Sequence, residues 1–145
     1  EELAYGLLIL FGVWALRRKD FLICMMLSGG ILLQVGISQL LKHLFVRLRP
    51  IEVLDGTRVL GPSLHHLSFP SGHTVFAFTV AGILFFRFRI AGWVLFLWAS
   101  QVALARVYMG AHFLSDVVVG AILGLGVAFM SVAITKQLKD TALKW

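Results

Sequence analysis

Charged residues are scarce in this sequence. They make up 14% of its 145 residues, against roughly 25% in ordinary soluble proteins. Hydrophobic residues reach 59%, so the chain has more apolar surface than a soluble or a disordered protein can expose to water. This composition predicts an integral membrane protein.

Cysteine and acidic residues are also few. The single cysteine, Cys24, lies inside an apolar run and can form no internal disulfide. Seven Asp and Glu stand against thirteen Lys and Arg, which gives a net charge of +6. Because the basic residues lie between apolar runs, the excess indicates contact with anionic headgroups or phosphates, and we expect no nucleic-acid partner.

Five uncharged runs alternate with short polar segments, which predicts an all-α bundle of five transmembrane helices in one domain, residues 1–145. A span needs about 20 apolar residues, and the second and fifth runs are long enough alone. The third reaches that length if its helix begins at Pro70, a residue well suited to the first helical position. The runs are Leu3–Leu16, Phe21–Leu41, Thr74–Phe86, Ile90–Ala105 and Val117–Thr135.

The interval from Lys42 to Phe69 is polar and rich in helix-breaking residues, so we expect an irregular loop at the membrane surface. In the last apolar run, three glycines are candidates for close helix packing. They are Gly120, Gly124 and Gly126.

The alternating helices divide the basic residues between the two membrane surfaces. One surface receives eight: Arg17, Arg18, Lys19, Arg87, Arg89, Lys136, Lys139 and Lys144. The other receives five: Lys42, Arg47, Arg49, Arg58 and Arg106. The positive-inside rule predicts that the surface with eight is cytoplasmic and that the long loop faces outward.

The outer surface collects polar residues that membrane anchoring does not explain. Lys42 and Arg49 are seven residues apart, so they would share the face of a helix that ends at Pro50. Interfacial snorkelling is the alternative for each of them. Ser71, Gly72 and His73 open the next helix, where free N–H groups favour an anion. Ser71 is also a plausible N-cap.

A third polar group follows the fourth apolar run. His112 and Asp116 stand four residues apart, a spacing that can place a carboxylate behind an imidazole. Such a carboxylate fixes the tautomer of the ring and stabilises its protonated form. Arg106 lies just before them. Together with the two earlier groups, this pattern indicates a site for chemistry on an anion.

These residues resemble the motifs of the type 2 phosphatidic acid phosphatase (PAP2) superfamily of membrane lipid phosphatases. The first motif corresponds to Lys42 through Arg49-Pro50, and the second, Pro-Ser-Gly-His, to Pro70 through His73. The third is matched by Arg106, His112 and Asp116, with Ala105 in place of the motif's serine. The family core has six helices, so the resemblance implies a further helix ahead of the five here.

The resemblance also implies a division of labour. His112 would be the nucleophile that forms a phosphohistidine, Asp116 would orient it, and His73 would protonate the leaving group. The phosphate would be held by Lys42, Arg49, Ser71, Gly72 and Arg106. The implied enzyme is a metal-independent lipid phosphatase without a cofactor, in a bacterial inner membrane, with its site facing the periplasm or exterior.

Several alternatives remain open. The substrate candidates are lipid A 1-phosphate, phosphatidylglycerophosphate, undecaprenyl diphosphate and phosphatidate. Ala105 motivates a protein that binds a lipid phosphate without turnover. A transporter or metal site would use His65, His66, His73 and His112, but the apolar runs contain no acidic residue and no zinc-binding spacing. Arg47, Arg58, His65 and His66 are candidates for contact with a second anionic group of the substrate.

Overall fold

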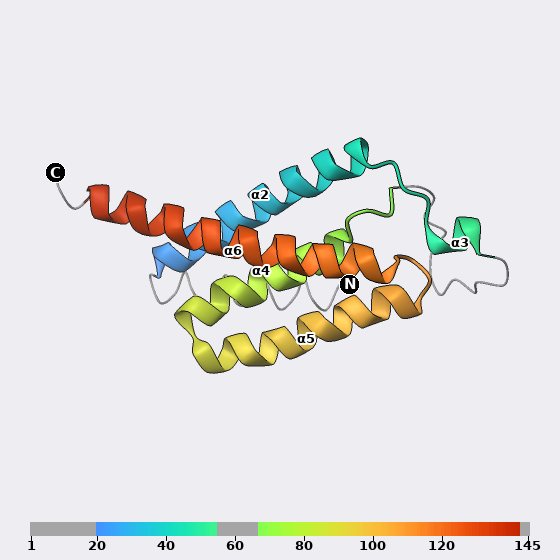
Figure 1. Ribbon diagram of the computed structural model, residues 1–145. Coiled ribbons are helices and arrows are strands. Elements are labelled where there is room, and N and C mark those ends of the chain that lie inside the picture. The colour runs from blue at the N-terminus through green and yellow to red at the C-terminus, as the bar shows by residue number, and fades with distance from the viewer. Residues whose placement is uncertain (1–19, 55–66, 143–145) are drawn as a thin grey trace.

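The structure, a computed structural model, describes residues 20–54 and 67–142, and its regular elements there are all helices. They are α2 (Phe21–Leu44), α3 (Pro50–Val53), α4 (Gly72–Arg87), α5 (Arg89–Tyr108) and α6 (Leu114–Ala142), as Figure 1 shows. The first apolar run, Leu3–Leu16, lies outside the described residues.

Three of these helices, α2, α5 and α6, are long and apolar enough to cross a membrane. Helix α4 has 16 residues. At 1.5 Å per residue it measures about 24 Å, less than the hydrocarbon thickness of about 30 Å. The prediction of an all-α membrane bundle is confirmed, whereas the described residues contain three helices of spanning length rather than five.

The ends of two helices differ from the predicted ones. Helix α2 ends at Leu44, so Lys42 and Arg49 do not share a helix. Arg49 has extended backbone, with φ −86° and ψ 158°, and the short helix α3 begins at Pro50. Proline disfavours helical backbone in the residue before it, which explains the extended backbone of Arg49. Helix α4 begins at Gly72 rather than at Pro70.

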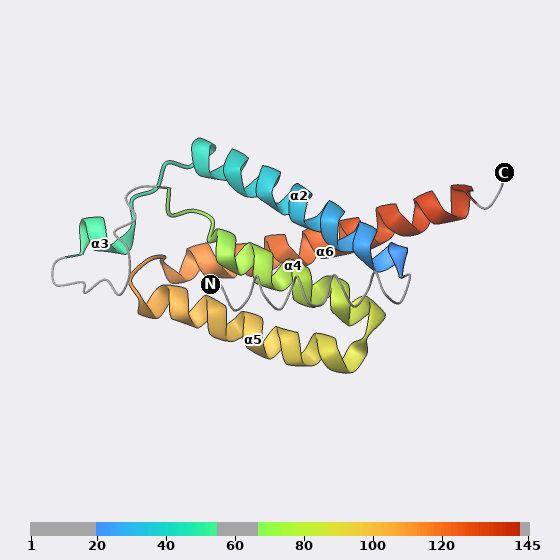
Figure 2. The same cartoon turned by 180° about the vertical axis from the view of Figure 1, so that it is seen from behind.

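Helix α4 is the centre of the bundle and packs against α2, α5 and α6, as the opposite views in Figures 1 and 2 show. It contributes more buried apolar side chains to the core than any other described helix, and α2, α5 and α6 add the others. These α4 side chains are Val75, Ala77, Val80, Ala81, Ile83 and Leu84. By contrast, α5 leaves most of its apolar side chains exposed, as expected of a helix that faces lipid.

Two glycines allow α6 to approach α4 closely. A Cβ atom added to Gly124 would lie 2.5 Å from the carbonyl oxygen of Val75, and one added to Gly120 would lie 3.1 Å from that of Ser71. Close approach of this kind strengthens helix packing in membranes, where the hydrophobic effect does not drive association. Among the described residues Gly126 has no such neighbour within 4 Å, so the prediction is confirmed for Gly120 and Gly124 and wrong for Gly126 within that part of the chain.

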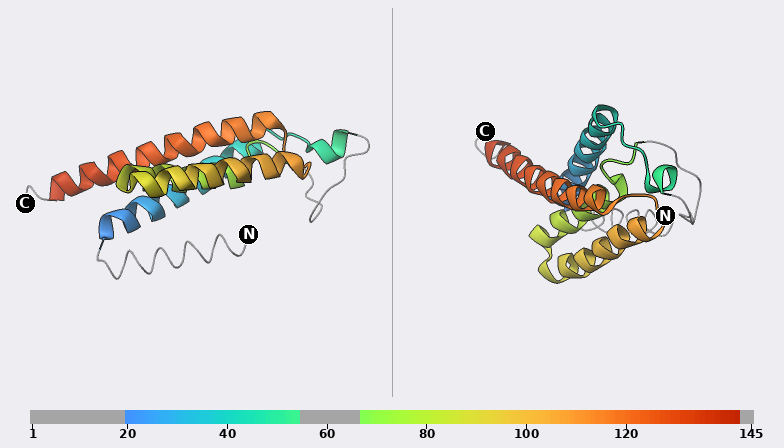
Figure 3. Two further views of the ribbon diagram at one scale, coloured as in Figure 1. Left: turned by 90° about the horizontal axis from the view of Figure 1, so that it is seen from below. Right: turned by 45° about the vertical axis from the view of Figure 1, so that its right-hand side comes forward.

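The polar residues gather at one end of the bundle. The end of α2, helix α3, the start of α4, the end of α5 and the start of α6 meet there (Figures 1 and 3). The opposite end carries Arg87, Arg89, Lys136 and Lys139, and an ion pair of 3.1 Å joins Arg87 to Asp20. The described basic residues therefore fall into two groups at opposite ends.

Candidate active site

The segment before α4 is irregular and buried, yet its backbone groups are paired. Ser68 donates its N–H to the carbonyl oxygen of Arg47 at 2.9 Å, and Ser71 donates its N–H to that of Asp116 at 3.2 Å. Ser68 and Ser71 have no exposed surface. Because buried N–H groups need partners, these bonds hold the segment against both the end of α2 and the start of α6.

A tight turn after α5 positions His112. Gly110 adopts a left-handed backbone conformation with φ 65°. The N–H of Gly110 bonds to the carbonyl of Val107, and that of Ala111 bonds to the carbonyl of Arg106, which is the Schellman pattern at a helix end. His112 follows directly and donates its own N–H to the Arg106 carbonyl at 3.2 Å.

The imidazole of His112 is 3% exposed, and its Nδ1 lies 2.7 Å from the main-chain oxygen of Ser68. A carbonyl oxygen can only accept a hydrogen bond, so Nδ1 must carry the hydrogen. In the neutral ring this leaves a lone pair on Nε2.

Burial is the main reason why the pKa of His112 is lowered from 6.5 to about 4. The positive charges of Arg49 and Arg106 lower it further, while the bond to Ser68 and the charge of Asp116 oppose the shift. His112 is therefore neutral at physiological pH and can act as a nucleophile through Nε2.

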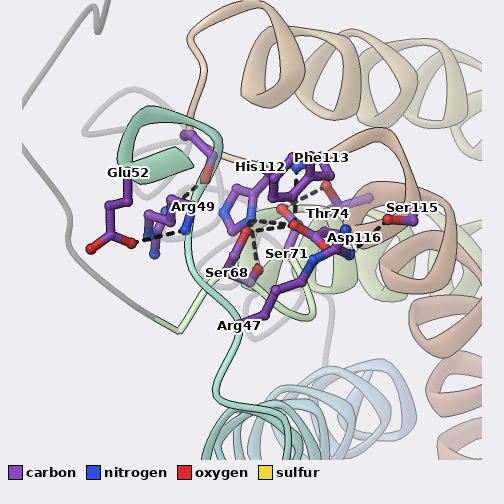
Figure 4. A network of polar contacts seen from close by, with 11 residues as sticks. Arg47, Arg49, Glu52, Ser68, Ser71, Thr74, His112, Phe113, Ser115 and Asp116 are labelled. Carbon is purple, nitrogen blue, oxygen red and sulfur yellow. Dashed lines mark hydrogen bonds and ion pairs between the residues drawn. The ribbon is translucent and has the colours of Figure 1, made fainter. Parts of the chain in front are cut away.

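Asp116 is fully buried in the first turn of α6 and accepts several bonds, which Figure 4 shows. Its donors are Arg47 Nη1 at 2.7 Å, Ser68 Oγ at 2.5 Å and the Phe113 N–H at 3.0 Å. The carboxylate also lies 3.7 Å from His112 Nδ1, on the predicted side of the ring. The shorter contact of that ring is nevertheless the one to Ser68.

Arg47 and Ser68 are the residues that the sequence motifs did not assign. Arg47, a candidate for contact with a second anionic group of the substrate, forms an ion pair with Asp116. It also bonds to Ser115 Oγ at 2.8 Å and lies 4.3 Å above the centre of the Phe113 ring. These contacts turn its guanidinium toward the protein.

Arg49 and Arg106 lie close to His112, and Lys42 lies close to both arginines. Arg49 is 6% exposed and donates from Nη1 to the Ala111 carbonyl at 3.0 Å. Burial and repulsion by Arg106 lower the pKa of Arg49, while Glu52 and Asp116 oppose the shift. A Cβ atom added to Gly72 would lie 3.9 Å from Lys42 Nζ, so Lys42 reaches the start of α4. Like charges held together in this way favour a bound anion.

The start of α4 contributes neutral donors and a second histidine. Ser71 is the N-cap residue of α4, as the sequence suggested, but within the described part of the chain its side chain makes no capping bond to the helix. Ser71 Oγ instead accepts a bond of 3.0 Å from Thr74. His73 lines a cavity of about 310 Å³ between α2 and α4, together with Lys42 and Gly72.

The structure therefore brings the predicted residues of all three motifs to one end of the bundle. Ala105, which replaces the motif's serine, is exposed on α5. Arg58, His65 and His66 lie outside the described residues, in the middle of the loop that was expected to carry them.

Comparison with known proteins agrees with these motifs. The chain is 32% identical over 119 residues to the undecaprenyl-diphosphatase of Sulfolobus acidocaldarius, covering 81% of this chain and 57% of that protein. It is 39% identical over 95 residues to the lipid A 1-phosphatase of Rhizobium johnstonii, covering 61% and 38%. The crystal structure of Aquifex aeolicus LpxE matches with a TM-score of 0.80 at 33% identity, covering 88% and 77%. Residues 21–140 match the PAP2 superfamily, and the chain belongs to this family, as its motifs predicted.

Proposed function

We propose that this chain hydrolyses a phosphate from a membrane lipid through a phosphohistidine at His112, without a metal. The observation that carries the proposal is the bond from His112 Nδ1–H to the Ser68 carbonyl, because it leaves the Nε2 lone pair available beside a cluster of cations. The chain spans 57% and 38% of the two relatives compared above, so the activity is proposed from its own residues.

Binding of the phosphate is the task of the cations and the start of α4. Arg49, Arg106 and Lys42 neutralise the dianion, and Arg guanidinium groups suit the geometry of phosphate oxygens. The hydroxyl of Ser71 and the N–H of Gly72 add neutral donors at the positive end of the α4 dipole. These groups also stabilise the charge that develops on the phosphoryl oxygens during transfer.

Chemistry then proceeds in two displacements. Nε2 of His112 attacks phosphorus, a P–N bond forms, and the bond from phosphorus to the lipid oxygen breaks. His73 gives its proton to that oxygen. Water next attacks the phosphohistidine and returns a proton to His73, and phosphate leaves as the P–N bond breaks. Asp116 stabilises the positive charge on the His112 ring in the intermediate.

A lipid is the proposed substrate because the site lies at the end of an apolar bundle and its cavity is lined by α2 and α4. The names of the two relatives point to different lipids, so four candidates are proposed. They are lipid A 1-phosphate, phosphatidylglycerophosphate, undecaprenyl diphosphate and phosphatidate.

The decisive experiment is capture of the phosphoenzyme. The protein is mixed in detergent with a lipid carrying a radiolabelled phosphate, quenched and tested for covalent label stable to alkali and labile to acid, as expected of a phosphohistidine. His112→Ala should abolish both the label and phosphate release. His43→Ala is the matched control, because His43 is exposed on α2. Wild-type protein that binds the lipid but neither takes up label nor releases phosphate would support the binding-protein alternative.

The role of His73 needs a separate test. His73→Ala should recover much more activity on an aryl phosphate than on a lipid phosphate, because an aryl leaving group needs little protonation. Equal losses on both substrates would contradict the assignment of the leaving-group proton to His73.

We also propose that the site faces the periplasm or exterior of a bacterial inner membrane, because the sequence places fewer basic residues at its end of the bundle than at the opposite end. In a Cys24→Ser background, Val53→Cys should react with an impermeant thiol reagent in whole cells. Leu138→Cys, at the opposite end and 54% exposed, should react only after permeabilisation. The reverse pattern would overturn the orientation.

A further inference from the structure

Helix α2 carries two buried polar side chains that the proposed chemistry does not use. Gln34 is 6% exposed and Ser38 is 5% exposed, although α2 is one of the apolar helices of spanning length. Polar groups in such a helix are costly unless they are hydrogen-bonded. Within the described part of the chain, Ser38 Oγ has no hydrogen-bond partner.

Both side chains line the cavity that also holds Lys42 and His73. Ser38 lies four residues before Lys42 and Gln34 lies eight before it, so they are about 6 and 12 Å further along the helix from the phosphate site. The cavity continues to Ile31 on α2 and Phe76 on α4. Its wall therefore changes from cationic to neutral polar and then to apolar.

The cavity lies between the C-terminal half of α2 and the first turns of α4. The two helices touch at Gly30, where an added Cβ atom would lie 2.7 Å from Ile83 Cδ1. All the α2 residues that line the cavity follow this contact in the chain. One of them is Val35, whose side chain is exposed, so a lipid could reach the cavity from the membrane.

Packing between helices does not account for Ser38. Elsewhere in α2 a polar bond of that kind exists, since Ser131 Oγ of α6 donates to the Met26 carbonyl at 2.6 Å. The hydroxyl of Ser38 makes no such bond to any residue that the structure describes, and it lines the cavity. A ligand with a hydrogen-bonding group at this depth would satisfy it.

The geometry points to an acylated lipid phosphate, in which Ser38 and Gln34 bind the ester or amide group that joins the head of the lipid to its acyl chains. This inference rests on the proposed function. Ser38 can donate its hydroxyl proton and Gln34 its amide protons to an acyl carbonyl. A polyprenyl chain has no such group, and among the described residues that line the cavity near Ser38 and Gln34 there is no cation for a second phosphate.

A pair of lipids isolates the acyl carbonyl. Dioleoyl phosphatidate and its dioleyl ether analogue have the same phosphate and matching chains, and only the first has carbonyl groups. Both are mixed in one micelle preparation, and the ratio of their kcat/KM values is measured. A variant that yields less folded protein lowers both rates by the same factor. The ratio is therefore independent of how well the variant folds.

Wild-type protein should prefer the ester by about fivefold for each hydrogen bond. Ser38→Ala should bring the ratio toward one, and the double variant Ser38→Ala/Gln34→Leu should reach it. Ser28→Ala should keep the wild-type ratio, because Ser28 lies on the same helix but is exposed and bonds to the Met25 carbonyl.

An equal rate on both lipids by wild-type protein, or an unchanged ratio in the double variant, would overturn this inference while leaving the phosphatase activity in place. Phosphate release from undecaprenyl diphosphate but from neither of these two lipids would likewise overturn this inference and leave the proposed function in place. Only the absence of phosphate release and of a phosphoenzyme with all four candidate lipids would overturn the proposed function, and this inference with it.

Discussion

The Nδ1 atom of His112 lies 2.7 Å from the carbonyl oxygen of Ser68 and 3.7 Å from the carboxylate of Asp116. The main chain, rather than the carboxylate, therefore fixes which nitrogen carries the hydrogen. Asp116 acts on His112 indirectly, because its carboxylate accepts a hydrogen bond of 2.5 Å from the hydroxyl of the same Ser68. It also forms an ion pair with Arg47.

Asp116→Asn should keep the correct tautomer of His112 and lose only the charge that stabilises its protonated ring. The carboxylate lies 3.7 Å from Nδ1, and two unit charges about 4 Å apart attract each other by about 1 kcal/mol in water and about 4 kcal/mol near a protein surface. The expected loss in kcat is therefore roughly 5- to 1,000-fold. Asp140→Asn, exposed at the far end of α6, is the control. A loss of about ten-thousand-fold would mean that the carboxylate sets the tautomer after all.

Arg47→Met should lower kcat several-fold and leave KM nearly unchanged, because Arg47 binds Asp116 rather than the phosphate. Solvent screens this pair, since the Arg47 side chain is 40% exposed. We therefore expect a loss of about 1 kcal/mol in stability, which thermal unfolding in detergent would detect. Arg49→Met should instead raise KM. A higher KM in Arg47→Met would show that Arg47 does contact the substrate.

The stability of the protein should depend on pH through His112. Its pKa is about 4 in the folded state and 6.5 in the reference state. Between these values only the unfolded chain binds the proton, so stability is complete above pH 6.5 and falls as the pH drops toward 4. The full shift corresponds to about 3 kcal/mol.

Melting temperatures in detergent from pH 7 to pH 4.5 would measure this effect. His112→Asn retains an N–H that can reach the Ser68 carbonyl but has no group that titrates, so it should lose less stability than the wild type on acidification. Identical pH profiles for the two proteins would contradict the lowered pKa of His112.

Gly110→Ala should impair both folding and catalysis, because Gly110 has a left-handed backbone conformation with φ 65°. A residue with a Cβ atom costs about 1–2 kcal/mol more there. Relief of that strain would move His112, so kcat should fall as well. Gly126→Ala is the matched control, since an added Cβ atom meets no neighbour within 4 Å. It should be neutral or stabilising.

The grouping of the motif residues could be predicted from the sequence, because alternating membrane helices bring the ends of the apolar runs to the same surface. Lys42, Arg49, His73 and His112 meet at one end for this reason. The ends of the helices were harder to predict. Apolar composition continues through Phe45 and Val46, but α2 stops at Leu44 and the chain runs extended toward Pro50.

The roles of Arg47 and Ser68 could not be predicted, because they depend on contacts between segments that are distant in the chain. Ser68 acts on His112 through a main-chain oxygen, and no side-chain pattern records such a contact. Arg47 is 69 residues from Asp116, and a backbone bond to Ser68 brings the two together. The sequence does not distinguish the role of Arg47 from the roles of its cationic neighbours.

The close contact between α4 and α6 at Gly120 and Gly124 has a consequence for how this protein can evolve. It holds the backbones of the second and third motifs against each other. Substitutions at the contact in either helix would therefore displace the proposed catalytic residues. Apart from Lys42, α2 contributes to the cavity mainly through side chains that could be substituted without disturbing the contact between α4 and α6. Descendants of one ancestral phosphatase could therefore diverge in the lipids they accept through changes in α2, while the reaction they perform stays the same.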